Sequence, residues 1–227
     1  MSSLALGDLG GRLNEIRRLC RMDPLRSGYS DDVATGNAIN RACVVLLCAH
    51  LEGFLEELVT EAIDSLVGRA MVERLPLTLR ALHAEEHLRE IEPTRDRSKR
   101  APKIERMFKE ESFLWSSGQV LEAAMVRPKA VCAEMSNPSS REVRQFLELL
   151  GIDIEQYLTN IGQESLLGKI NGLVALRNSI AHGEVTASAT AADVDQYLNV
   201  VGELGRSIDE AVGLAVMRMC NMTSVRW

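Results

Sequence analysis

One long segment with helical periodicity, from Asp32 to about Val67, restricts what this chain can fold into. Apolar residues recur there at intervals of three and four, and on a helical wheel they share one broad arc: Ile39, Cys43, Leu46, Leu47, Leu51, Phe54 and Leu58. Val45 and Cys48 extend the arc, so we expect burial on more than one side. The preceding Ser30-Asp31-Asp32 offers N-capping side chains. The sequence therefore predicts a helix of about 35 residues, roughly 52 Å long, as the spine of the fold.

The rest of the chain also has helical periodicity and no alternating strand pattern. Its 46% hydrophobic but only 4% aromatic content favours interdigitating helices over a sheet sandwich. Capping boxes are predicted at Ser139 with Glu142 and at Thr190 with Asp193. We expect a loop over 22–29, a basic break around Pro93 and Pro102, and helices over 4–20, 69–91, 103–115, 119–126, 141–150, 152–160, 164–182 and 190–221.

These segments predict one all-α domain over residues 1–227, with long antiparallel helices. Its core would come from two blocks, about 1–67 and 164–221. The middle, about 69–160, would be a helical insertion between them.

Cysteine usage and hydropathy predict a cytoplasmic protein without a membrane segment. The five cysteines are odd in number and contain no CxxC pair, which excludes a disulfide framework or a zinc knuckle: Cys20, Cys43, Cys48, Cys132 and Cys220. The start, Met1 to Leu13, lacks the pattern of a signal peptide. The uncharged run Ala42 to Leu51 is about half the length needed to cross a bilayer.

The charge of the chain is unevenly distributed. Its net charge of −6 argues against a protein coated in nucleic acid, and we expect no DNA partner. Residues 95–109 nevertheless contain seven basic side chains and two acidic ones, a local balance of +5. This basic island predicts local contacts with RNA phosphates, chiefly through Arg95, Arg97, Lys99, Arg100 and Lys103. A solvated surface is the alternative.

The most unusual chemistry lies at the end of the predicted 164–182 helix. Asn178 and His182 are four positions apart, so both project from one helical face. Arg177 is an always-charged, fork-shaped partner for a phosphate. His182 can give or take a proton near neutral pH. Gly183 would end the helix and let the histidine turn back over its last turn.

The pattern of Arg, a polar residue, three more residues, His and Gly resembles the HEPN superfamily. The step Leu176-Arg177-Asn178 is similar to those proteins, and the early segment Arg41 to Phe54 resembles the long helix of a bacterial branch called RiboL-PSP-HEPN. The resemblance covers about 31–67 and 164–221. It implies a HEPN-type helical bundle.

The resemblance also implies a function: an endoribonuclease that needs no metal or other cofactor. The RNA 2′-hydroxyl would attack its own phosphate, with His182 as general base or acid, Arg177 binding the phosphate, and Asn178 orienting either. Such proteins place two motifs face to face in a homodimer. The setting would be phage defence, a toxin–antitoxin pair or RNA stress and repair, with an antitoxin or defence-system partner protein. The alternative is a HEPN module that binds RNA or a protein without cutting.

Three further acidic or histidine features remain as candidates. His83-Ala84-Glu85-Glu86-His87 matches the HxxEH zinc-peptidase pattern, but its charged, arginine-flanked context favours a solvated helix face and no metal. His50 lies in the apolar arc of the long helix and is expected to be a core histidine. Glu52 shares a stripe with Arg41 and Cys48, where a charge must be paired or functional, so Glu52 is a secondary catalytic candidate.

Overall fold

The structure is a computed structural model that describes residues 2–27, 32–133, 137–184 and 188–224. Within these ranges it is helical, with one isolated bridge between Met71 and Val120 instead of a strand. The predicted all-α class is confirmed. In chain order the elements are α1 (Leu4–Arg21), α2 (Pro24–Ser27), α3 (Val33–Leu66), η1 (Val72–Arg74), α4 (Leu77–Ile91), α5 (Arg97–Glu111), η2 (Ser112–Trp115), α6 (Pro128–Cys132), α7 (Ser140–Leu149), α8 (Ile154–Asn160), α9 (Ser165–Ala181) and α10 (Ala191–Cys220).

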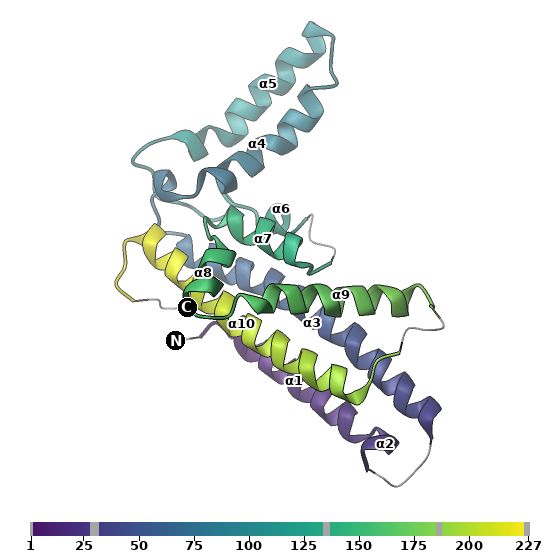
Figure 1. Cartoon of the computed structure of the whole chain (residues 1–227). Coiled ribbons are helices and arrows are strands. Elements are labelled where there is room, and N and C mark those ends of the chain that lie inside the picture. The colour runs from purple at the N-terminus through teal and green to yellow at the C-terminus, as the bar shows by residue number, and fades with distance from the viewer. Residues whose placement is uncertain (1, 28–31, 134–136, 185–187, 225–227) are drawn as a thin grey trace.

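Helices α1, α3, α9 and α10 pack against one another as a bundle (Figure 1). The predicted spine is confirmed as α3, whose first turn is capped by Asp32 accepting a hydrogen bond from the Thr35 amide. Ser30 and Asp31 lie outside the described residues. Cys48 is buried as predicted, but Val45 is 37% exposed, so the apolar arc is narrower on that side.

Helix α10 comes very close to α1 at a glycine. A Cβ atom added to Gly205 would lie 2.6 Å from Cδ2 of the buried Leu9, so any larger residue here would force the Leu9 side chain to shift. The predicted capping box of Thr190 and Asp193 starts α10. At α7 only half of the predicted box forms, because Ser139 accepts from the Glu142 amide while the Glu142 carboxylate accepts from the Asn137 amide.

The middle of the chain forms a two-helix arm, α4 and α5, that projects from the bundle (Figure 1). Shorter helices fix its root: α6 contacts α3, α7 contacts α9, and α8 contacts α10. The loop expected over 22–29 is partly helical, as α2.

Two helix predictions in this middle segment are wrong at their ends. The helix expected over 69–91 begins only at Leu77, because the residue before Pro76 is extended and η1 precedes it. The helix expected over 103–115 begins earlier, at Arg97, where Asp96 caps it. The break expected at Pro102 is therefore absent, and α5 continues through the proline.

No helix forms over 119–126, where one was predicted. Gly118 has a φ of +76°, and the chain after it pairs with the segment following α3. The Gly68 amide donates to the Leu121 carbonyl at 2.8 Å, and the Leu121 amide donates to the Ala70 carbonyl at 2.8 Å. These bonds hold the segment extended. Among the helices of the described ranges, none combines the length and the apolar character that a membrane span requires.

Candidate functional site

The motif residues lie together at the C-terminal end of α9. His182 is the C-cap residue, and Gly183 follows it with a φ of +71°. The Gly183 amide donates to the Ile180 carbonyl and the Glu184 amide to the Ser179 carbonyl, both at 3.1 Å. This pair of bonds is a Schellman motif, which needs a left-handed residue at the glycine position. Gly183 therefore ends the helix where the sequence predicted.

Arg177 and Asn178 are joined by their side chains. The Arg177 Nη1 donates to the Asn178 Oδ1 at 3.0 Å, and both residues are half-buried. The sequence suggested that Asn178 orients the histidine or a phosphate. In the structure its Oδ1 accepts from the guanidinium, which restricts the directions in which Arg177 can donate its remaining hydrogens.

Within the described ranges, neither of the two basic motif side chains is neutralised by a direct ion pair. His182 is exposed, and neither it nor Arg177 has a salt bridge to a carboxylate in the described part of the chain. A fixed guanidinium and an accessible imidazole at one helix end can bind an anion and transfer a proton.

Glu52 and Cys48 lie one helical turn apart on α3, which packs against α9. Burial raises the pKa of the Cys48 thiol to about 11, and the charge of Arg177 opposes that rise. Burial and the neighbouring Glu56 raise the pKa of Glu52, and Arg177 again opposes the rise. The Arg177 charge therefore acts on both α3 groups, and Glu52 belongs to the surroundings of the motif.

His50 is not a core histidine, contrary to the sequence-based expectation. Its side chain is half-buried. Burial lowers its pKa, as does Arg12 of α1, while Glu15 raises it. The helical wheel shows which residues of α3 share the apolar arc, but not which of them another helix covers. That depends on where α1 packs.

His83 and His87 do not lie on a solvated helix face, as the sequence suggested, but are 0% and 7% exposed. The imidazole Nε2 of His87 lies 3.2 Å from the Glu111 Oε1. The Arg127 Nη2 lies 3.4 Å from the His83 Nδ1 and 2.6 Å from the Glu86 Oε2. These residues from α4, α5 and the segment before α6 form a polar cluster at the root of the arm, in which His83, His87 and Glu111 are buried while Glu86 and Arg127 are exposed.

The cluster does not have the geometry of a zinc site. Across the described ranges, no group of three or more His, Cys, Asp or Glu side chains is arranged to hold a metal ion. The Arg127 guanidinium lies beside the His83 Nδ1, and its positive charge would repel a cation there. The metallopeptidase alternative has no support in this arrangement.

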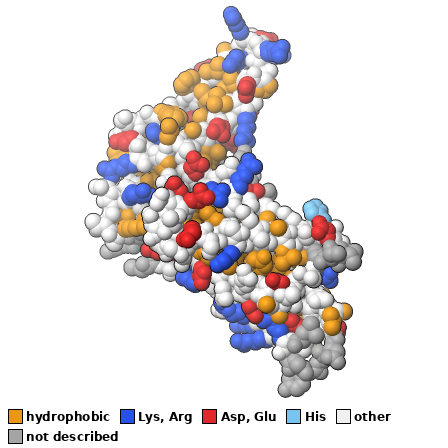
Figure 2. Space-filling view, in the orientation of Figure 1, with side chains coloured by type: hydrophobic (Ala, Val, Ile, Leu, Met, Phe, Trp, Pro, Cys, Tyr) orange, Lys and Arg blue, Asp and Glu red, His pale blue; other side chains and the backbone are white. Residues whose placement is uncertain are grey.

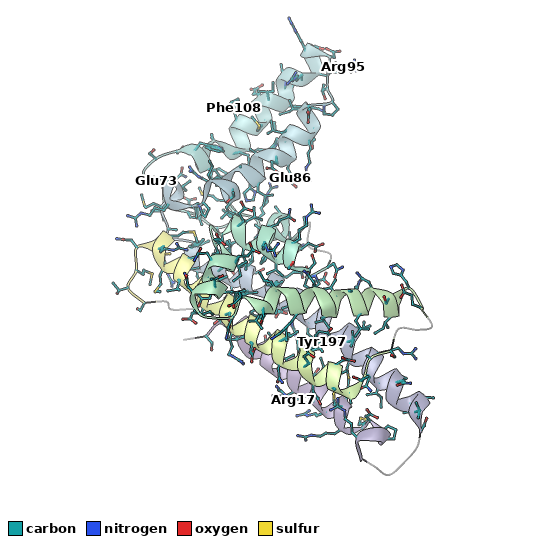
Figure 3. The ribbon with its side chains drawn as sticks, viewed as in Figure 1. Arg17, Glu73, Glu86, Arg95, Phe108 and Tyr197 are labelled. Atoms are coloured by element: carbon teal, nitrogen blue, oxygen red, sulfur yellow. The ribbon has the colours of Figure 1, made fainter. Side chains whose placement is uncertain are left out.

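The basic island occupies the tip of the arm and the length of α5. Figure 2 shows Lys and Arg side chains at the end of the projection, and Figure 3 labels Arg95 there. Two of its cations hold the arm together: Lys103 Nζ donates to the Glu90 carbonyl and the Thr94 hydroxyl, and Arg106 pairs with the Glu90 carboxylate. No such partner is found in the described ranges for Arg95, Arg97, Lys99 or Arg100, all of them exposed.

The sequence missed two further features of this region. The exposed Arg127 contacts the buried His83, although nothing in the local sequence of Arg127 marks it. Phe108 and Trp115 are exposed aromatic side chains, at 65% and 50%, and the Arg80 guanidinium lies 5.3 Å from the centre of the Trp115 ring. The charge count of 95–109 drew attention to this segment but not to its aromatic residues.

The helical bundle with an Arg–Asn pair and a histidine at the end of one long helix defines an all-α protein of the HEPN type. The model of the RiboL-PSP-HEPN family matches residues 8–213. This chain therefore belongs to the RiboL-PSP-HEPN family, as the resemblance predicted, and the matched range includes the middle segment. Comparison with curated proteins and with solved structures gave no significant match.

Proposed function

We propose that this protein is an endoribonuclease that cleaves RNA without a metal ion, through Arg177 and His182. The observation that carries the proposal is the end of α9, where a half-buried guanidinium held by Asn178 and an exposed imidazole both lack a salt bridge to the described carboxylates. The family match supports a role with RNA, as a nuclease or as a binding module.

The chemistry assigned to each residue follows from its side chain. His182 accepts the proton of the RNA 2′-hydroxyl as that oxygen attacks the adjacent phosphorus, or donates a proton to the departing 5′-oxygen. The bond from phosphorus to the 5′-oxygen breaks, which leaves a 2′,3′-cyclic phosphate and a 5′-hydroxyl. Arg177 binds the phosphate oxygens and stabilises the negative charge that builds on them.

The surroundings on α3 have a supporting role. Glu52, whose pKa is raised chiefly by burial, lies within the influence of the Arg177 charge. We assign it to the site as a positioning residue for Arg177 and not as the proton carrier. The setting we propose is phage defence, a toxin system or RNA stress, with a regulatory protein partner.

The active unit is proposed to be a homodimer, because one histidine cannot serve as base and acid at the same moment. Two copies related by a two-fold axis would supply a second His182 and a second Arg177 to one composite site. We expect light scattering at micromolar concentration to give twice the mass of the 25.1 kDa chain. A monomeric mass would contradict the composite site.

Cleavage should persist in EDTA, because Arg177 takes the role at the phosphate that a cation has in metal-dependent nucleases. The measurement is incubation of the purified protein with total cellular RNA in chelator, followed by gel analysis. The His182→Ala protein, purified identically, controls for contaminating nucleases. Loss of cleavage in EDTA with recovery on adding zinc would contradict the proposal.

A further inference from the structure

The α4–α5 arm combines cations that have no ion-pair partner in the described chain with an exposed aromatic side chain. On an ideal helix, Arg97, Arg100, Ile104 and Phe108 follow one another at intervals of three and four, so they share a stripe along α5. Arg97 and Phe108 are then about 16 Å apart along the helix axis. In Figure 3 Arg95 marks the tip of the arm and Phe108 lies partway down its side.

The burial pattern shows that no described element covers this face. Helix α5 packs mainly against α4 and η2, and its only buried residue is Glu111. Phe108 is 65% exposed and Leu88 of α4 is 48% exposed. Figure 2 shows hydrophobic side chains gathered along the visible side of the arm, below the basic tip.

The charges at the tip of the arm indicate which kind of ligand it can bind. Residues 95–109 carry a balance of +5, and the acid nearest the tip cations, Asp96, is used to cap α5 through the Ser98 amide. Glu92, the next acid toward the root, is exposed, and Glu90 beyond it is paired with Arg106. The tip cations are therefore suited to a polyanion, and an aromatic ring on the same stripe is suited to a flat, stackable group.

We infer that the arm binds single-stranded RNA, with phosphates on Arg95, Arg97, Lys99 and Arg100 and an unpaired base stacked on Phe108. This inference rests on the proposed function for the choice of RNA as the polyanion. Bases inside a duplex already stack on their neighbours, so the aromatic contact selects single strands. The tip of the arm and the end of α9 lie at separate corners of the chain in Figure 1, so the arm holds RNA away from the same subunit's Arg177 and His182.

The test measures binding of a fluorescent single-stranded RNA by anisotropy, with the full-length protein carrying His182→Ala to prevent cleavage. Phe108→Ala should weaken binding about 5- to 150-fold, the range for loss of one stacked base. Phe108→Trp should bind as tightly as the parent, and Phe108→Leu should be as weak as alanine. Parental affinity in Phe108→Leu would show a general apolar contact, as for a protein partner, and would overturn the inference.

The cations are tested through salt dependence. Changing Arg95, Arg97, Lys99 and Arg100 to serine should lower the slope of log affinity against log salt by about 3, at roughly 0.7 per phosphate contact on a single strand. The matched control changes three exposed cations of α1, Arg17, Arg18 and Arg21, to serine and should leave the slope unchanged. An unchanged slope in the tip variant, or equal affinity for a duplex, would overturn the inference.

The two proposals fail separately. If the protein without the His182→Ala change cleaves no RNA, the proposed nuclease activity is wrong, whereas the anisotropy comparison still decides the role of the arm. If cleavage occurs and the arm variants bind normally, the nuclease proposal stands and the arm inference is wrong.

Discussion

Replacing His182 by alanine should lower RNA cleavage by about 10²–10⁴-fold, the usual contribution of a positioned general acid or base. The side chain is exposed at the end of α9, so its loss removes no core contact. The free energy of unfolding should fall by about 1 kcal/mol or less, the value of a cation at a helix C-terminus. Single-turnover cleavage of a labelled RNA measures the first effect, and denaturant unfolding measures the second.

Arg177→Ala should also lower RNA cleavage by about 10²–10⁴-fold. It should weaken RNA binding as well, because it removes a positive charge at the phosphate. Since the two residues act on the same transition state, the double variant should be little worse than either single one. Lys169→Ala is the matched control, as it removes an exposed cation from the same helix away from its end. Cleavage that survives both motif substitutions would show that the α9 motif is not catalytic.

The free energy of unfolding should fall steeply as the pH drops from about 6.5 to 4, because His83 is buried in a neutral form. Arg127 only donates hydrogen bonds, so the His83 Nδ1 accepts and the proton sits on Nε2, which has no partner in the described part of the chain. Burial, with Arg127 as the second cause, lowers the pKa of His83 from 6.5 to about 4.

The sign of this effect follows from proton linkage. The unfolded chain takes up a proton on His83 below about pH 6.5, whereas the folded chain does so only near pH 4, so acid favours unfolding across this window. The loss amounts to roughly 3 kcal/mol at the acid end, at about 1.4 kcal/mol for each unit of pKa difference. Above pH 7 the histidine is neutral in both states and contributes no pH dependence.

The measurement is urea unfolding of the parent and of His83→Leu from pH 7.5 to pH 4. The difference in unfolding free energy between the two proteins isolates the contribution of His83 from that of the other groups in the chain. We expect the variant to lose less stability on acidification than the parent by about 3 kcal/mol. Parallel curves would show that His83 can be protonated in the folded state without cost.

Local sequence predicted the features of this fold that depend on neighbouring residues. Asp32 and Thr190 begin helices as predicted because a capping side chain bonds to amides only two or three residues away. The end of α9 was predictable for the same reason, since the bonds around Gly183 span at most five residues. The placement of Arg177, Asn178 and His182 on one helix end follows from these local rules.

Features that depend on contacts between distant segments were not predictable. His83 and His87 have the sequence context of a solvated helix, yet Arg127 and Glu111, 44 and 24 residues further along the chain, enclose them. The segment around Leu121 was predicted to be a helix, but backbone bonds to Gly68 and Ala70 hold it extended.

By itself the sequence determined an all-helical chain, the long spine α3, the caps of its main helices and the motif at the end of α9, because each rests on a periodicity or on bonds between close neighbours. Only the tertiary structure decided which polar groups are buried, which cations at the arm tip lack a partner in the described chain, and that Phe108 stands exposed on the same arm. Burial and pairing are properties of the surfaces that meet after the chain has folded, and residues far apart in the sequence supply those surfaces.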